Sequence, residues 1–89
     1  MSYIVFYPMG DKVYYNDDDQ AHRLNGPALI TSFGFNYFIN GKRHRLDGPA
    51  VIGIGPYHGI KEWWYQGHWI RGCCSQEEFK KLLKMKAFW

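Results

Sequence analysis

With 89 residues, the chain has room for one small domain with a thin hydrophobic core. Aromatic side chains are abundant, with four Trp, seven Tyr and six Phe, and the net charge of only +3 weakens the case for a protein that binds DNA or RNA through many phosphate contacts. No apolar run reaches the roughly 18 residues of a membrane span, and residues 1–10 are too short for a signal peptide. We therefore expect a cytoplasmic protein that makes no membrane contact.

The central part of the chain contains a repeated motif. Residues 22–30 read His-Arg-Leu-Asn-Gly-Pro-Ala-Leu-Ile and return as His-Arg-Leu-Asp-Gly-Pro-Ala-Val-Ile at residues 44–52. A similar upstream half precedes each copy, and a third upstream half covers residues 59–69. Arg71 then falls where Arg45 stands in the second copy, but no Gly-Pro-Ala follows, as is common for a terminal repeat. The sequence predicts one domain over residues 1–89, with repeat units at about 10–32, 33–56 and 59–72.

Each unit has the pattern of a strand, a tight turn and a second strand. The segments 37–39 and 63–65 are aromatic or β-branched, which favours strands. Asn40-Gly41 is the strongest hairpin signal, because a type I′ turn needs positive φ at both central residues. Gln66-Gly67 is a weaker version, and the extra residue near Asp17-Asp18 favours a longer loop. These patterns predict a mainly β (α+β) fold, in which an antiparallel β-hairpin repeat meander is followed by one α-helix.

The pattern changes near the C-terminus. Ser75 is a good helix N-cap, and Glu78 three residues later completes a capping box. Apolar residues then recur at helical spacing, with lysines on the other side. The sequence predicts a helix over about residues 75–87 that covers one end or face of the sheet.

The chain contains two cysteines, Cys73 and Cys74, which are adjacent. A disulfide between neighbours is strained, so we expect two reduced thiols. No segment has the ligand spacing of a zinc site, so we predict neither a metal nor a cofactor. No local motif groups a nucleophile with a base, and repeats multiply a surface rather than build one catalytic centre. We therefore expect no catalytic residues and no enzymatic activity.

The second copy carries a resemblance to a known group of proteins. Its pattern, aromatic-aromatic-x-Asn-Gly-x-x-His-Arg-x-Asp-Gly-Pro-Ala, resembles a repeat found in small proteins of tailed bacteriophages and large DNA viruses, and more loosely MORN-type repeats. The matching residues are Asn40, Gly41, His44, Arg45, Asp47, Gly48, Pro49 and Ala50. The first copy departs from this pattern by lacking the Asn-Gly turn and by carrying Asn25 in place of Asp. The resemblance implies a phage or viral source and a β-repeat fold, and implies no enzyme chemistry.

The repeated His-Arg pairs at positions 22–23 and 44–45 allow two interpretations. In the first, each Arg stacks on an aromatic ring of the neighbouring unit and bonds the Asn or Asp of the turn, which would hold the repeats together. In the second, the Arg side chains line one concave face and bind phosphates. The motif alone does not separate these two interpretations.

We expect a phage-encoded binding protein that acts in the cytoplasm of an infected bacterium as a counter-defence factor and sequesters a small anionic nucleotide signal. The alternatives are an inhibitor that covers a host protein, such as a nuclease or an immune effector, and a direct binder of nucleic acid. Open sheet edges at the ends of a repeat stack also predict a homo-oligomer, most simply a dimer. The candidate ligand-binding residues are Arg23, Tyr37, Lys42, Arg43, His44, Arg45, Trp63, Trp64, Trp69 and Arg71.

Overall fold

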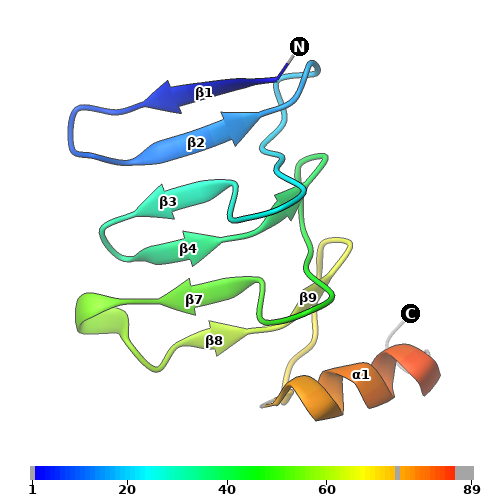
Figure 1. Cartoon of the computed structure of the whole chain (residues 1–89). Helices are drawn as coiled ribbons and strands as arrows, with labels where there is room; N and C mark the ends of the chain where they lie inside the picture. Colours follow the sequence, from blue (N-terminus) through cyan, green and yellow to red (C-terminus); the bar gives the residue numbers. More distant parts are fainter. Residues whose placement is uncertain (1, 74, 86–89) are drawn as a thin grey trace.

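The computed structural model describes residues 2–73 and 75–85 as a stack of hairpins with a helix at one end (Figure 1). The strands in these residues are β1 (Tyr3–Phe6), β2 (Lys12–Tyr15), β3 (Leu29–Thr31), β4 (Gly34–Asn36), β5 (Phe38–Ile39), β6 (Lys42–Arg43), β7 (Val51–Gly53), β8 (Lys61–Glu62), β9 (Trp64–Tyr65) and β10 (His68–Trp69). The 3-10 helix η1 covers Gly55–Tyr57, and the α-helix α1 covers Gln76–Met85. The predicted mainly β fold with antiparallel hairpins and one C-terminal helix is confirmed.

The strands of the described residues belong to one main sheet and two side hairpins. The six-stranded main sheet has the order β1-β2-β3-β4-β7-β8, while β5–β6 and β9–β10 form separate two-stranded ladders. Figure 1 shows the hairpins of the main sheet stacked one below the other, with the side hairpins along one flank. The meander therefore includes two side hairpins that lie outside the main sheet. The chain leaves the main sheet after β4 and returns at β7, and after β8 it forms β9–β10 and continues to α1.

The turns of the side hairpins follow the residues at their tips. Asn40 and Gly41 have φ values of 49° and 82°, as a type I′ turn requires. Gln66 and Gly67 adopt nearly the same conformation, at 46° and 84°, so the weaker sequence signal forms the same turn. In the first unit a longer loop replaces this turn, as predicted. There the Gln20 carbonyl accepts a hydrogen bond from the Asn16 N–H.

Strand β1 precedes the first predicted repeat unit and was not predicted from the sequence. Its residues, Tyr-Ile-Val-Phe, are good strand formers, and they pair with β2 in the register Val5 opposite Val13. The Tyr3 ring stacks on Tyr15, and its hydroxyl donates a hydrogen bond of 2.6 Å to Asp19. Mainly because of this hydrogen bond, the pKa of Tyr3 is raised to about 12. The continuous run of aromatic and β-branched residues at 3–7, just ahead of Gly10, was the signal that could have revealed this strand.

The main hydrophobic core lies at the α1 end of the stack. Trp63 and Ile70 are 5% exposed and Phe79 is fully buried, and these three pack together. Ser75 Oγ accepts a hydrogen bond from the Glu78 N–H, which confirms the predicted N-cap. Residues 86 and 87 of the predicted helix lie outside the described residues. Elsewhere the protein is a thin layer, with extents of 41 × 32 × 17 Å, and both faces of the sheet keep partly exposed side chains.

Candidate functional site

The side hairpins connect each repeat unit to the one before it. Arg23 N–H donates to the Phe38 carbonyl at 3.1 Å, and Gly41 N–H donates to the Ala21 carbonyl at 2.9 Å. The next interface repeats this pair, with Arg45 N–H donating to Trp64 and Gly67 N–H donating to Arg43. The two interfaces therefore use the same backbone positions of the motif.

The motif histidines complete these interfaces. His22 Nδ1 accepts a hydrogen bond of 2.9 Å from the Asn40 N–H, and His44 Nδ1 accepts one of 3.0 Å from the Gln66 N–H. The donors are the turn residues with positive φ. A neutral imidazole whose Nδ1 is an acceptor carries its proton on Nε2. Burial lowers the pKa of His44, which favours this neutral form.

The motif arginines stack on aromatic rings. The Arg23 guanidinium carbon lies 4.0 Å from the centre of the Tyr14 ring, and that of Arg45 lies 4.0 Å from the centre of the Tyr37 ring. Both rings belong to the same unit as their Arg, so the expectation that each Arg reaches the neighbouring unit is wrong. Arg45 Nε also donates to Asp47 at 3.2 Å, as expected for a bond to the turn residue.

Both arginines hold the end of their own turn. Arg23 Nη1 donates to the Pro27 carbonyl at 3.2 Å, and Arg45 Nη1 donates to the Pro49 carbonyl at 3.1 Å. The Arg45 side chain remains 22% exposed. In both copies the Arg thus contacts a tyrosine ring and a proline carbonyl of its own unit, which gives the Arg side chains a structural role.

The motif glycines pack closely against the guanidinium groups. A Cβ atom at Gly26 would lie 2.8 Å from Arg23 Cζ, and one at Gly48 would lie 2.7 Å from Arg45 Cζ. Each guanidinium therefore has an aromatic ring on one side and a bare glycine on the other. The alanines that follow, Ala28 and Ala50, are fully buried, which explains the small residue at this position of the motif.

A groove of about 540 Å³ lies between the motif turns of the first and second units. It brings together four of the predicted site residues, namely Arg23, Tyr37, His44 and Arg45. The other residues of its wall were not among the predicted site residues; they are Leu24, Asn25, Gly26, Ile39, Leu46 and Asp47. Most of these residues could have been predicted from their place in the repeated motif, because they are sequence neighbours of Arg23 and Arg45 and line the groove with them.

The groove has a mixed electrostatic character. The two guanidinium groups carry positive charge, and the Asp47 carboxylate, whose side chain is 89% exposed, offsets part of it. The equivalent residue of the first unit is the neutral Asn25. A second hollow beside the first unit includes Asp17 and Asp18 in its wall. Of these two hollows, the groove is the better place for an anion.

The remaining predicted residues lie elsewhere. Arg43, Trp64, Trp69 and Arg71 form a row in which Arg43 lies 5.1 Å from the Trp64 ring, Trp64 stacks on Trp69 at 6.0 Å, and Arg71 lies 4.7 Å from the Trp69 ring. Lys42 lines a smaller hollow beside His44. The predicted set is thus divided between the groove, this row and the surface next to it.

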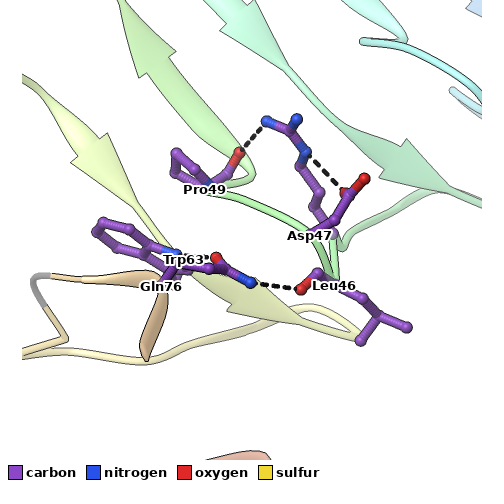
Figure 2. A network of polar contacts seen from close by, with 6 residues as sticks. Leu46, Asp47, Pro49, Trp63 and Gln76 are labelled. Carbon is purple, nitrogen blue, oxygen red and sulfur yellow. Dashed lines mark hydrogen bonds and ion pairs between the residues drawn. The ribbon is translucent and has the colours of Figure 1, made fainter. Parts of the chain in front are cut away.

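Trp63 does not offer its ring to a ligand. It is 5% exposed, and its Nε1 donates to Gln76 Oε1 at 2.9 Å. Gln76 Nε2 in turn donates to the Leu46 carbonyl at 2.7 Å, so α1 is attached to the motif turn of the second unit (Figure 2). Trp63 is the third unit's equivalent of Tyr37, and α1 covers it. Arg71, the equivalent of Arg45, stacks on Trp69 instead.

Among residues 2–73 and 75–85, no group of three or more His, Cys, Asp or Glu side chains is placed to hold a metal ion. The Cys73 thiol donates a hydrogen bond of 3.4 Å to the Ser75 carbonyl, and Cys74 lies outside the described residues. In the same part of the chain, no helix is both long and apolar enough to cross a membrane. Comparisons with protein-family models, with curated proteins and with solved structures found no match for this chain.

Proposed function

We propose that the protein is a non-enzymatic binding protein whose groove takes a small anionic ligand with a planar ring. The observation that carries this proposal is the convergence of Arg23 and Arg45, from successive repeats, on one groove of about 540 Å³. Ligand pockets commonly have volumes of roughly 300–1,000 Å³ and a few placed polar groups in an apolar wall.

The groups in the wall suit a nucleotide. Each Arg uses Nη1 for a proline carbonyl, and a guanidinium has five N–H donors, so others remain for phosphate oxygens. His44 carries its proton on Nε2 because Nδ1 accepts the Gln66 N–H, which provides a further donor. Tyr37, Leu24 and Leu46 supply apolar surface for a base.

The biological role follows from the resemblance to small phage proteins. A phage protein that binds a nucleotide without cleaving it would remove a signal made by a bacterial defence system. We therefore propose a counter-defence factor that acts in an infected cell by sequestering such a signal. This role depends on the resemblance, whereas the ligand class depends on the groove.

A second candidate is an inhibitor that covers a host protein. It is favoured by exposed apolar side chains on the loops at the other end of the hairpins, where Phe33, Tyr57 and Ile60 are 58%, 47% and 42% exposed. These residues line an apolar hollow of about 230 Å³. Exposed apolar patches of this kind commonly contact other proteins.

The test exchanges the residues at one equivalent position of the two units, which is Asn25 in the first unit and Asp47 in the second. The fold accepts either residue at this position of the motif. Asn25→Asp adds a negative charge to the groove, and Asp47→Asn removes one, and each variant copies the residue of the other unit. We expect Asn25→Asp to weaken binding of an anionic ligand about tenfold and Asp47→Asn to strengthen it by a similar factor. Calorimetry against cyclic di- and trinucleotides and ADP-ribose derivatives measures both changes.

The control is Lys61→Gln, which changes the charge of an exposed residue of β8 that is not part of the groove wall. It should leave affinity within about twofold of the wild type. If no nucleotide binds the folded protein while a stoichiometric host protein is recovered in a pull-down, the ligand proposal is wrong and the inhibitor takes its place. If a single-stranded oligonucleotide binds better than any mononucleotide or cyclic nucleotide, direct nucleic-acid binding takes its place.

A further inference from the structure

The main sheet ends at β1, which is paired only with β2 among the described strands. The direction of its backbone groups follows from the register. Tyr7 N–H donates to the Asp11 carbonyl just beyond the strand, and in an antiparallel ladder the residues that exchange hydrogen bonds with one neighbour alternate with those that do not. Tyr3, Val5 and Tyr7 therefore direct their backbone groups at β2. The N–H and C=O groups of Ile4 and Phe6 point to the open edge.

This edge lacks the features that normally prevent pairing between proteins. Residues 3–6 include neither a charge nor a proline, and Ile4 and Phe6 are 44% and 72% exposed. The opposite edge, β8, consists of Lys61 and Glu62 and is two residues long. Short and charged edge strands resist pairing, whereas a longer uncharged one is a template for another strand.

We propose that the protein forms a homodimer in which β1 pairs with β1 of a second copy in antiparallel orientation, which joins the two main sheets into one. A two-fold axis perpendicular to the sheet keeps equivalent faces on the same side, so residues opposite each other must belong to the same face. Only one register meets this condition and lets both Ile4 and Phe6 form backbone hydrogen bonds with β1 of the second copy. In this register Val5 lies opposite Val5, and Ile4 lies opposite Phe6. Ile4 and Phe6 then exchange backbone hydrogen bonds with Phe6 and Ile4 of the second copy.

The side chains of the edge support a second copy as the occupant. In this register the exposed Ile4 lies beside the exposed Phe6 on one face, and Tyr3, which is 41% exposed, lies beside Tyr7, which is 45% exposed, on the other. Each exposed side chain gains an aromatic or aliphatic cross-strand partner, and such pairs stabilise a sheet. Because the edge carries no charge, the two copies meet without repulsion at these positions.

The first test uses a matched pair of variants. Ile4→Lys and Ile60→Lys replace isoleucines of similar exposure, 44% and 42%, and only Ile4 lies at the β1 edge. Analytical ultracentrifugation should show wild type and Ile60→Lys at twice the 10.5 kDa of one chain. Ile4→Lys should raise the dissociation constant of the dimer at least about tenfold, because lysine on an edge strand opposes pairing. A wild type that stays monomeric at high concentration overturns the proposal, as does equal dissociation of the two variants.

The second test separates edge pairing from other modes of dimerisation. Ile4→Pro removes an N–H that points away from β2, so the β1–β2 ladder keeps its hydrogen bonds while the dimer loses one donor from each copy. We expect a monomer whose circular dichroism retains the β signal. A dimer of unchanged affinity in this variant would show that another surface mediates association and would overturn the proposal.

The third test reads the register. In a background with Cys73→Ser and Cys74→Ser, Val5→Cys should form a disulfide-linked dimer on mild oxidation, because a non-hydrogen-bonded antiparallel pair brings the two Cα atoms to about 4.5 Å. Cross-linking of Ile4→Cys without cross-linking of Val5→Cys would overturn the register. No residue of β1 lines the groove, so a monomeric variant should still bind the ligand, and failure of the dimer leaves the proposed function testable on its own.

Discussion

At the scale of single residues, the motif His-Arg-x-Asn/Asp-Gly-Pro-Ala is accounted for by contacts. The histidine accepts a backbone N–H from the next unit, and the arginine fits between a tyrosine ring and a bare glycine. The sequence was sufficient to single out the His-Arg pairs, and stacking of the arginine on an aromatic ring was one of the two interpretations that it allowed. It was not sufficient to identify the ring, because Tyr14 and Tyr37 lie several residues upstream of their motifs. The chain must turn back, through a loop after Tyr14 and through β5–β6 after Tyr37, before each arginine meets its ring.

The glycine contact predicts the effect of adding one methyl group. Gly48 does not have a positive φ, so alanine fits its backbone conformation, but its Cβ would lie 2.7 Å from Arg45 Cζ. We expect Gly48→Ala to lower the free energy of unfolding by about 1–2 kcal/mol, because the Arg45 guanidinium must shift and weaken its hydrogen bonds to Asp47 and the Pro49 carbonyl. Urea denaturation measures this change. In an Arg45→Ala background the same substitution should cost little, and an undiminished cost there would contradict the contact.

The histidine contact predicts a pH dependence of stability. Burial lowers the pKa of His44 in the folded state, so the unfolded chain binds more protons at mildly acidic pH. The stability that His44 contributes is fully present above its unfolded pKa of about 6.5 and is lost as pH falls towards the lowered folded pKa. Urea denaturation between pH 5 and 8 should show this loss, on the order of 1 kcal/mol for the neutral hydrogen bond.

Two substitutions serve as controls for this pH dependence. His44→Ala should flatten the dependence, because it removes the titrating group. His68→Ala, at an exposed position, should leave it unchanged. The account of His44 fails if His44→Ala keeps the wild-type slope.

The turns of the side hairpins are stabilised both by their own residues and by hydrogen bonds to the preceding repeat unit. Asn40-Gly41 and Gln66-Gly67 adopt the same left-handed pair of conformations, although glutamine is a poor residue for positive φ. The Gln66 N–H is held by His44 and the Gly67 N–H by the Arg43 carbonyl. The contacts with the preceding unit therefore stabilise a turn that its own sequence specifies only weakly.

A reciprocal exchange tests this turn. Gln66→Asn should stabilise the protein by about 0.5–1 kcal/mol, because asparagine tolerates the left-handed conformation better, and Asn40→Gln should destabilise it by a similar amount. Both variants keep the backbone N–H that donates to the histidine. Thermal denaturation of the two variants compares them directly, and a shift of the melting temperature in the same direction for both would contradict the explanation.

The sequence predicts well where helix α1 begins, but it does not predict which residues the helix contacts. Ser75 caps α1 as its spacing with Glu78 indicates. The role of Gln76, which joins Trp63 to the Leu46 carbonyl, has no sequence signal because it connects residues far apart in the chain. The third unit therefore ends without Gly-Pro-Ala and is covered by α1 in place of a further repeat (Figure 1).

The whole molecule is a thin repeat stack with grooves and open edges, and its main hydrophobic core is confined to the α1 end. The repeat predicted the fold class, since a motif that returns in register produces equivalent interfaces. The groove was only partly predictable. Arg23, His44 and Arg45 were singled out, but their meeting in one wall depends on how far the second unit lies from the first. Trp63 was placed among the ligand-binding residues because aromatic residues that bind ligands and aromatic residues of the core have the same sequence signature.

An NMR titration of the protein with a cyclic dinucleotide, which follows side-chain and backbone N–H signals together, tests whether the groove is the binding site. If the ligand binds in the groove, the largest shifts should occur at Arg23 Nε, Arg45 Nε and the backbone amides of residues 24–26 and 46–47. The indole N–H of Trp69, in the row outside the groove, should move little. Saturable shifts centred on Trp69 and Arg71, with the groove signals unchanged, would contradict the claim that the space between the repeats is the binding site.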